Sequence, residues 1–178
     1  MLVVAVVVVV AILLIASLAV LFWPSGGGDS GSETIGFQGG SLSITSGALD
    51  GLRIEVPSGA TEDSVDFDVT SEEVDDLPGL PEEGSIASRL ITINTDGSDG
   101  WNTFRMFDNA LTVTLPYDDD LVDDEEAVRF YVYDPARDHF EPTGFISQDY
   151  DRNTITFQAS TFSQFVAIEV AMSLLEGA

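Results

Sequence analysis

The first 23 residues, MLVVAVVVVVAILLIASLAVLFW, carry no charged side chain, and Ser17 is their only polar residue. As an α-helix rising about 1.5 Å per residue, this segment would be about 34 Å long, enough to cross a hydrocarbon core of about 30 Å. Trp23 ends the run, and tryptophan concentrates at membrane interfaces. The sequence therefore predicts one N-terminal hydrophobic helix over 1–23 that anchors the chain in a membrane. The side chains expected to contact lipid or neighbouring helices include Leu2, Val10, Leu14, Leu21 and Trp23.

A cleaved signal peptide is the alternative interpretation of this segment. Such a peptide has a basic n-region and a shorter apolar region before a small-residue cleavage site, whereas no Lys or Arg precedes the run here. Ser17 and Ala19 fit a −3/−1 pair, but cleavage after Ala19 would leave Val-Leu-Phe-Trp on the mature chain. We therefore favour a retained single-pass helix with the remainder of the chain outside the cytoplasm.

Composition limits the partners of the chain. It has 31 Asp and Glu against 6 basic residues, all of them Arg, and a formal net charge of −25. Such a charge repels the phosphate backbone, which excludes nucleic acid as a partner, and it disfavours anionic lipid headgroups. An acidic, lysine-free chain resembles proteins of salt-adapted microbes, in which molar salt screens repulsion between like charges. The absence of Cys excludes disulfides and thiolate sites and favours a prokaryotic envelope over a eukaryotic cell surface.

Behind the helix, the pattern predicts a flexible Gly/Ser-rich linker over 24–34, a domain over 35–170 and a C-terminal tail over 171–178. Within the domain, apolar residues alternate with polar ones in short runs that are separated by Gly and Pro turns. Eight or so such strands predict an all-β fold, an antiparallel β-sandwich. The apolar positions that mark the strands are Leu42/Ile44, Leu52/Ile54/Val56, Val65/Phe67/Val69, Ile91/Ile93, Leu111/Val113/Leu115, Val128/Phe130/Val132, Ile155/Phe157 and Val166/Ile168/Val170.

Four stretches carry a family resemblance. IGFQGGSL at 35–42 is followed by GLRIEVPSGA at 51–60 and VDFDVT at 65–70, and STFSQFV at 160–166 lies near the end of the domain. This order of a Gly-Gly turn, a strand, a Pro-x-Gly-Ala corner and another strand resembles the ZU-five domain and its microbial surface-protein relatives. The resemblance covers about Ile35 to Val170 and implies a β-sandwich that serves as a structural or interaction module.

The resemblance also implies a question about self-cleavage. Some ZU-five relatives cut themselves at a His-Phe/Ser junction, and Phe162-Ser163 matches that junction, but Thr161 stands where the histidine would be. A threonine hydroxyl does not act as a base near neutral pH. His139, the only histidine, follows Asp138 in a turn distant in sequence, where we expect it to face solvent. We therefore expect an uncut chain, with Phe162 and Phe165 in the core, and no enzymatic activity.

Calcium is the one cofactor that the residues suggest, at an acidic loop between two predicted strands. Carboxylate oxygens are the ligands that Ca²⁺ prefers, although the loop lacks the Gly and the ligand spacing of an EF-hand. A solvated acidic loop without metal is the alternative. The candidate ligands are Asp118, Asp119, Asp120, Asp123 and Asp124.

An aromatic segment breaks the two-residue period. We interpret Trp101, Phe104 and Phe107 as part of a loop that caps one end of the sandwich, with an exposed patch for a partner as the alternative.

These observations predict a membrane-anchored, extracytoplasmic structural or interaction module of a microbial cell envelope, which contacts the membrane or itself through the helix and other envelope proteins through the sandwich. Two alternatives stay open. One is a pilin-like filament subunit whose N-terminal helices bundle in the filament core. The other is a calcium-binding or polysaccharide-binding surface domain.

Overall fold

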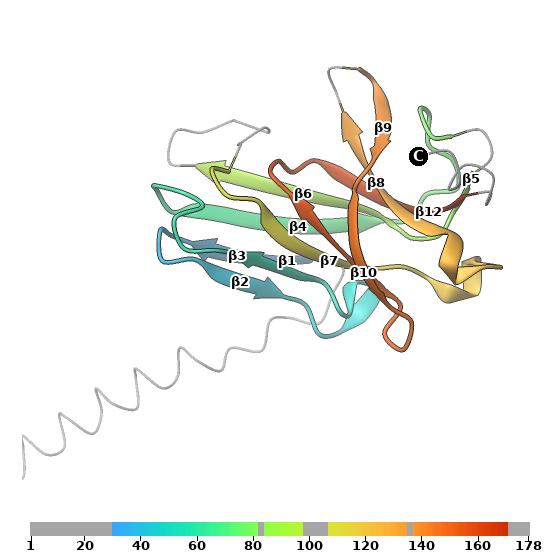
Figure 1. Cartoon of the computed structure of the whole chain (residues 1–178), viewed down its shortest axis with the longest axis horizontal. Coiled ribbons are helices and arrows are strands. Elements are labelled where there is room, and N and C mark those ends of the chain that lie inside the picture. The colour runs from blue at the N-terminus through green and yellow to red at the C-terminus, as the bar shows by residue number, and fades with distance from the viewer. Residues whose placement is uncertain (1–29, 82–83, 98–106, 135–136, 171–178) are drawn as a thin grey trace, which may run out of the picture.

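The structure is a computed structural model, and it describes residues 30–81, 84–97, 107–134 and 137–170 (Figure 1). These residues form strands and three short 3₁₀ turns, with no α-helix among them. The elements of the first half are β1 (Ser30–Ile35), β2 (Gly40–Ser43), η1 (Gly47–Leu49), β3 (Arg53–Val56), β4 (Val65–Glu72), β5 (Gly84–Ile86) and β6 (Leu90–Gly97). Those of the second half are β7 (Leu111–Pro116), η2 (Asp119–Leu121), η3 (Glu125–Ala127), β8 (Val128–Asp134), β9 (His139–Pro142), β10 (Gly144–Asp149), β11 (Thr154–Ala159) and β12 (Gln164–Val170).

The strands pair into two antiparallel sheets. The first has the order β1-β4-β6-β12-β8-β9, with β5 also paired to β12, and the second has the order β10-β11-β7-β3-β2. Because β5 and β6 both pair with β12, they follow it as one interrupted strand, and the interruption lies at Ala87–Arg89. There the Ser88 hydroxyl accepts a hydrogen bond from the Ala167 amide at 2.8 Å, which replaces a missing ladder contact.

The two sheets pack face to face around one core, as the alternating pattern predicts. Because side chains alternate across a strand, every second residue of β3, β4 and β7 points inward. Ile54, Phe67 and Val113 are all fully buried. At the centre, Phe162 meets Phe67 edge-on at 5.7 Å between ring centroids and lies 6.3 Å from Phe165. Both Phe162 and Phe165 are 1% exposed, so the prediction that they fill the core is confirmed.

A second, smaller cluster covers the outer face of the first sheet. Val166, Ile168 and Val170 of β12 pack there with Leu90 and Phe140. Their neighbours Phe165 and Ala167 point into the main core, so β12 is buried on both faces. The nearly continuous apolar run of β12 is the sequence signature of such a strand.

The two glycine turns of the family resemblance contact each other. Gly39 has a φ of +76° and Gly59 a φ of +77°, a region that glycine enters without steric cost. The Gly59 amide donates to the Phe37 carbonyl at 2.9 Å, which links the Pro-x-Gly-Ala corner to the Gly-Gly turn. The motifs thus fix one end of the β1, β2 and β3 region.

The prediction of a linker over 24–34 is wrong for its last residues, because Ser30–Ile35 forms β1 and pairs with β4 along its whole length. The strand was not predicted because its residues are mostly polar. An edge strand of this kind is held by backbone hydrogen bonds to its neighbour, which leave no hydrophobic pattern in the sequence. A Cβ at Gly31 would lie 2.8 Å from Cδ1 of Ile44, so a larger residue there would displace the Ile44 side chain. Three further short strands, β5, β9 and β10, were not predicted either, since none shows a clean two-residue period.

The all-β class and the two-sheet arrangement are confirmed. Within the part of the chain that the structure describes, no helix is long and apolar enough to cross a membrane. The predicted helix over 1–23, with Leu2, Val10, Leu14, Leu21 and Trp23, lies outside the described residues, as does the tail over 171–178.

Candidate functional site

The acidic loop joins β7 to β8 and folds into two 3₁₀ turns. Asp118 is the N-cap of η2, and its carboxylate accepts from the Asp120 amide at 3.1 Å. Asp124 is the N-cap of η3 and accepts from the Glu126 amide, also at 3.1 Å. Aspartate is favoured at such positions because its short side chain satisfies an amide that the turn leaves unpaired. Part of the acidity of this loop therefore has a local structural role.

Glu169 of β12 ties the loop to the first sheet. Its two carboxylate oxygens accept from the amides of Asp123 and Asp124 at 3.0 and 2.9 Å. A carboxylate that accepts two backbone N–H groups forms strong, charge-assisted hydrogen bonds. The sequence analysis missed Glu169, because a single acid in an apolar strand gives no signal of the loop that it will contact.

A second tie runs through Tyr117, which is 6% exposed. Its hydroxyl donates to Glu125 at 2.5 Å and accepts from Nε2 of Gln148 at 3.1 Å. Gln148 also donates to the Glu125 carbonyl at 2.9 Å. Burial, and then the hydrogen bond to Glu125, raises the pKa of Tyr117 from 10.0 to about 12. Through these hydrogen bonds the hydroxyl connects η3 to β10.

The five candidate calcium ligands lie on this loop, but the structure does not bring them into one cage. Asp118 and Asp124 each cap a different turn, and Asp119, Asp120 and Asp123 are exposed. Over the described ranges, no group of three or more His, Asp or Glu side chains has an arrangement that would hold a metal ion. The calcium site stays an untested prediction.

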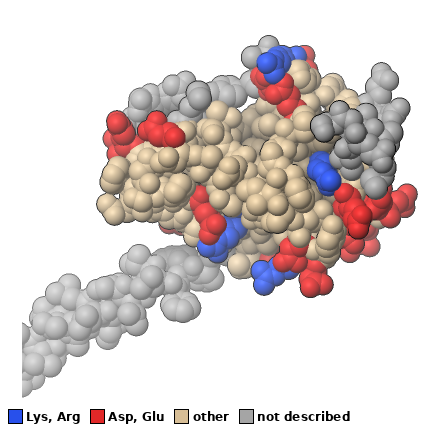
Figure 2. Space-filling view, in the orientation of Figure 1, with Lys and Arg blue, Asp and Glu red and all other residues tan. Residues whose placement is uncertain are grey.

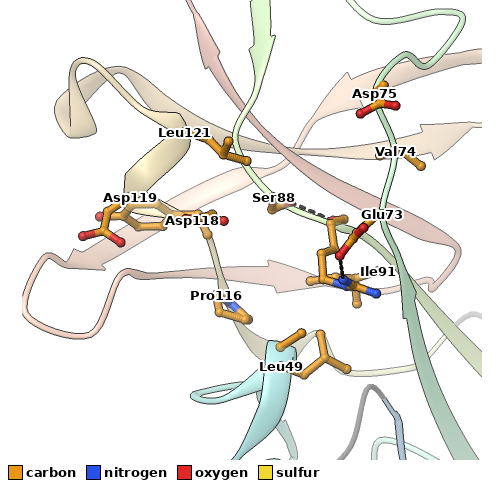
Figure 3. A pocket seen from close by; sticks show the side chains of 13 residues that line it. Leu49, Glu73, Val74, Asp75, Ser88, Ile91, Pro116, Asp118, Asp119 and Leu121 are labelled. Atoms are coloured by element: carbon orange, nitrogen blue, oxygen red, sulfur yellow. Dashed lines mark hydrogen bonds and ion pairs between the residues drawn. The ribbon is translucent and has the colours of Figure 1, made fainter.

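A cleft of about 450 Å³ opens beside the acidic loop, next to η1. In Figure 3, Asp118, Asp119 and Leu121 lie on one side of the cleft and Glu73 and Asp75 on the other. Its floor is formed by the apolar side chains of Leu49, Ile91 and Pro116.

Arg89 is the one basic residue among those that line this cleft. Its Nε donates to the Ser71 hydroxyl at 3.0 Å and its Nη1 to Glu73 at 2.9 Å. The remaining carboxylates give the cleft a negative potential. Figure 2 shows the same trend on a larger scale, with acidic side chains gathered at the end of the sandwich that carries the η2–η3 loop.

The aromatic segment divides between the core and residues that the structure does not describe. Phe107 is 5% exposed and packs against Phe67 and Phe162, with ring centroids 5.9 and 5.6 Å apart. Its side chain is therefore not on the surface, where the patch interpretation would place it. Trp101 and Phe104 lie outside the described residues.

His139 lies at the start of β9 and is about half-exposed. Its Nε2 is 3.3 Å from Glu141, and its Nδ1 is 3.3 Å from the Arg137 carbonyl. The sequence analysis placed His139 in a turn, whereas it is the first residue of β9, directly after the turn at Arg137 and Asp138, and its side chain is partly exposed.

No protein-family model and no curated protein matches this chain.

Proposed function

We propose that the chain is a membrane-anchored, extracytoplasmic structural or interaction module of a microbial, salt-adapted cell envelope, with a sandwich of the ZU-five-like kind. One observation carries this proposal: an uncharged run of 23 residues precedes an acidic β-sandwich with its own core, and the first strand already begins at Ser30. Only residues 24–29 separate the two parts. At about 3.5 Å per residue, six residues span at most about 21 Å, so the anchor would hold the sandwich close to the membrane surface.

The surface of the sandwich supports an interaction role. Its described part combines a strongly negative end with exposed large apolar side chains, a pairing typical of protein contacts. The acidic loop is held by Glu169 and Tyr117, so it presents its outward carboxylates from a defined backbone. Such pre-organisation lowers the cost of binding.

Extraction of membranes with alkaline carbonate tests the anchor. The full chain should stay in the membrane pellet, whereas a variant that lacks residues 1–23 should be found in the soluble fraction. A full chain released by carbonate would contradict the proposal. A shear fraction of intact cells tests the filament alternative. If the chain is a filament subunit, electron microscopy of the negatively stained fraction should show filaments built of this chain.

A further inference from the structure

Strand β10 exposes large apolar side chains on the surface of the second sheet. Phe145 is 48% exposed and Ile146 is 50% exposed, and Tyr150, in the turn to β11, is 51% exposed. Together they make up three of the five large apolar residues that are exposed in the described part of the chain; the others are Phe37 and Leu121. The surface over β10 is largely free of charged side chains in Figure 2. Exposed apolar side chains gathered on one element are typical of a protein contact site.

The backbone of β10 also has a free edge. On one side β10 pairs with β11, and no strand in the described ranges pairs with its other side. The pairing register shifts between Phe145 and Ser147, so Ile146 is an extra, bulged residue. A bulge lets Phe145 and Ile146 project differently from a regular strand, and an unpaired edge accepts an additional extended segment.

The acidic loop borders this apolar surface. A groove of about 420 Å³ lies between Tyr150 and the η2–η3 loop, and its walls include Asp123 and Glu126. Arg129 connects the groove to β10, because its guanidinium donates to the Glu126 carbonyl and lies 4.9 Å from the ring centroid of Phe145. The groove thus continues through Arg129 to Phe145. We call this region the β10 surface; it consists of the groove, Tyr150, Arg129, Phe145 and Ile146.

Charge decides which partner fits the β10 surface. A second copy of the chain would bring another net charge of −25 against the same acidic rim, and an anionic membrane would be repelled for the same reason. The chain has no lysine, and its 6 Arg are scattered, so no segment of its own alternates basic and apolar residues. A segment of a different protein that carries both basic and apolar side chains complements the acidic groove and the apolar side chains of β10.

We propose that the β10 surface binds an extended, basic segment of a partner protein, in which Lys or Arg alternates with apolar residues. The segment adds as a strand to the free edge of β10, its apolar side chains contact Phe145 and Ile146, and its cations enter the acidic groove beside Tyr150. An ammonium or guanidinium over the Tyr150 ring also gains cation–π attraction. This inference rests on the proposed role of the chain as an interaction module and names the chemistry of its partner.

The test uses the full chain in micelles of an uncharged detergent and the fluorescent peptide KVKFKVK as the probe. Two control peptides are EVEFEVE, which reverses the charge, and KPKFKPK, in which proline keeps the charge but blocks strand pairing. Binding is measured by fluorescence anisotropy at the lowest sodium chloride concentration at which circular dichroism shows the full chain folded, because more salt screens the attraction between charges. We expect saturable binding of KVKFKVK and at least about tenfold weaker binding of both controls, a difference of about 1.4 kcal/mol.

Two double variants locate the site. Phe145→Ser/Ile146→Ser removes apolar contacts, and Asp123→Asn/Glu126→Gln removes two carboxylates whose side chains have no role as helix caps. Each should weaken the binding of KVKFKVK about tenfold or more, as expected for central contact residues. The matched controls are Phe37→Ser, at another exposed aromatic residue, and Asp75→Asn/Asp76→Asn, at two exposed acids outside the groove. Neither should change the affinity more than about twofold.

Three results would overturn the inference. The first is no saturable binding of KVKFKVK. The second is a loss of affinity in the control variants as large as that in the site variants, which would mean non-specific attraction to an acidic protein. The third is a dimer in analytical ultracentrifugation that Phe145→Ser/Ile146→Ser abolishes, which would assign the surface to a second copy. A thermal melt of each variant is the control for an intact fold. Because membrane extraction does not depend on β10, a failure here is distinguishable from a failure of the proposed anchor.

Discussion

The substitution Gly39→Ala tests whether the turn chemistry of the Gly-Gly motif sets the fold. At a φ of +76°, alanine is strained by about 1 kcal/mol or more relative to glycine. In addition, its Cβ would lie 2.5 Å from the Val56 carbonyl oxygen and 2.8 Å from the Ser58 amide nitrogen. Both atoms are backbone, so the end of β3 must shift, and such overpacking costs about 1–3 kcal/mol. We expect a total loss of about 2–4 kcal/mol.

For a domain of this size, about 3 °C of melting temperature corresponds to 1 kcal/mol, so the midpoint should fall by about 6–12 °C. The assay is a circular-dichroism melt of the full chain in uncharged detergent and molar sodium chloride. Gly144→Ala is the matched control, because nothing lies within 4 Å of its added Cβ and its φ is not in the left-handed region. It should leave the midpoint nearly unchanged. Equal midpoints for the two variants would refute the reasoning.

Further predictions concern the core, the charge, pH and the integrity of the chain. Phe162→Ala should lower the free energy of unfolding by about 3–5 kcal/mol in denaturant titrations, since Phe162 is 1% exposed; a loss below about 1 kcal/mol would contradict its core position. The melting temperature should rise from dilute buffer to molar sodium chloride as repulsion within the acidic loop is screened, and a salt-independent midpoint would contradict an adaptation to salt. The pKa of Tyr117 is raised, so its stabilisation is complete below pH 10 and is lost as pH rises toward 12. This loss should be about 2–3 kcal/mol, measured by denaturant titration across that range, and Tyr117→Phe should remove it; an unchanged pH profile would be the contrary result. Denaturing gels of freshly purified protein should show one uncut chain, whereas a fragment that begins at Ser163 would make that serine a nucleophile.

Periodicity predicted most of the core correctly because burial on one face imposes a period of two. All eight predicted apolar runs lie on strands or directly beside them, and Phe67, Val113 and Phe157 are fully buried. β1 was not predicted because its residues are mostly polar and it is held in the sheet by pairing with β4. β10 escaped because its exposed Phe145 and Ile146 belong to a bulge and not to an alternating pattern.

The candidate site was predictable in part. The acidic loop is visible in the sequence, and the capping roles of Asp118 and Asp124 follow from local preferences for aspartate. The contributions of Glu169 and Gln148 were not predictable, because each reaches the loop from a strand more than twenty residues away. Only tertiary structure brings such groups together.

The most direct test of the account asks on which side of a membrane the sandwich lies and whether it is anchored there. The natural chain has no cysteine, so a single exposed Ser41→Cys variant gives a unique label site. Intact cells are treated with a membrane-impermeant maleimide, and the membranes are then washed with alkaline carbonate. The account predicts a labelled, full-length chain in the washed membrane pellet. Labelling only after lysis, or a labelled chain that the wash releases, would contradict an anchored module outside the cytoplasm.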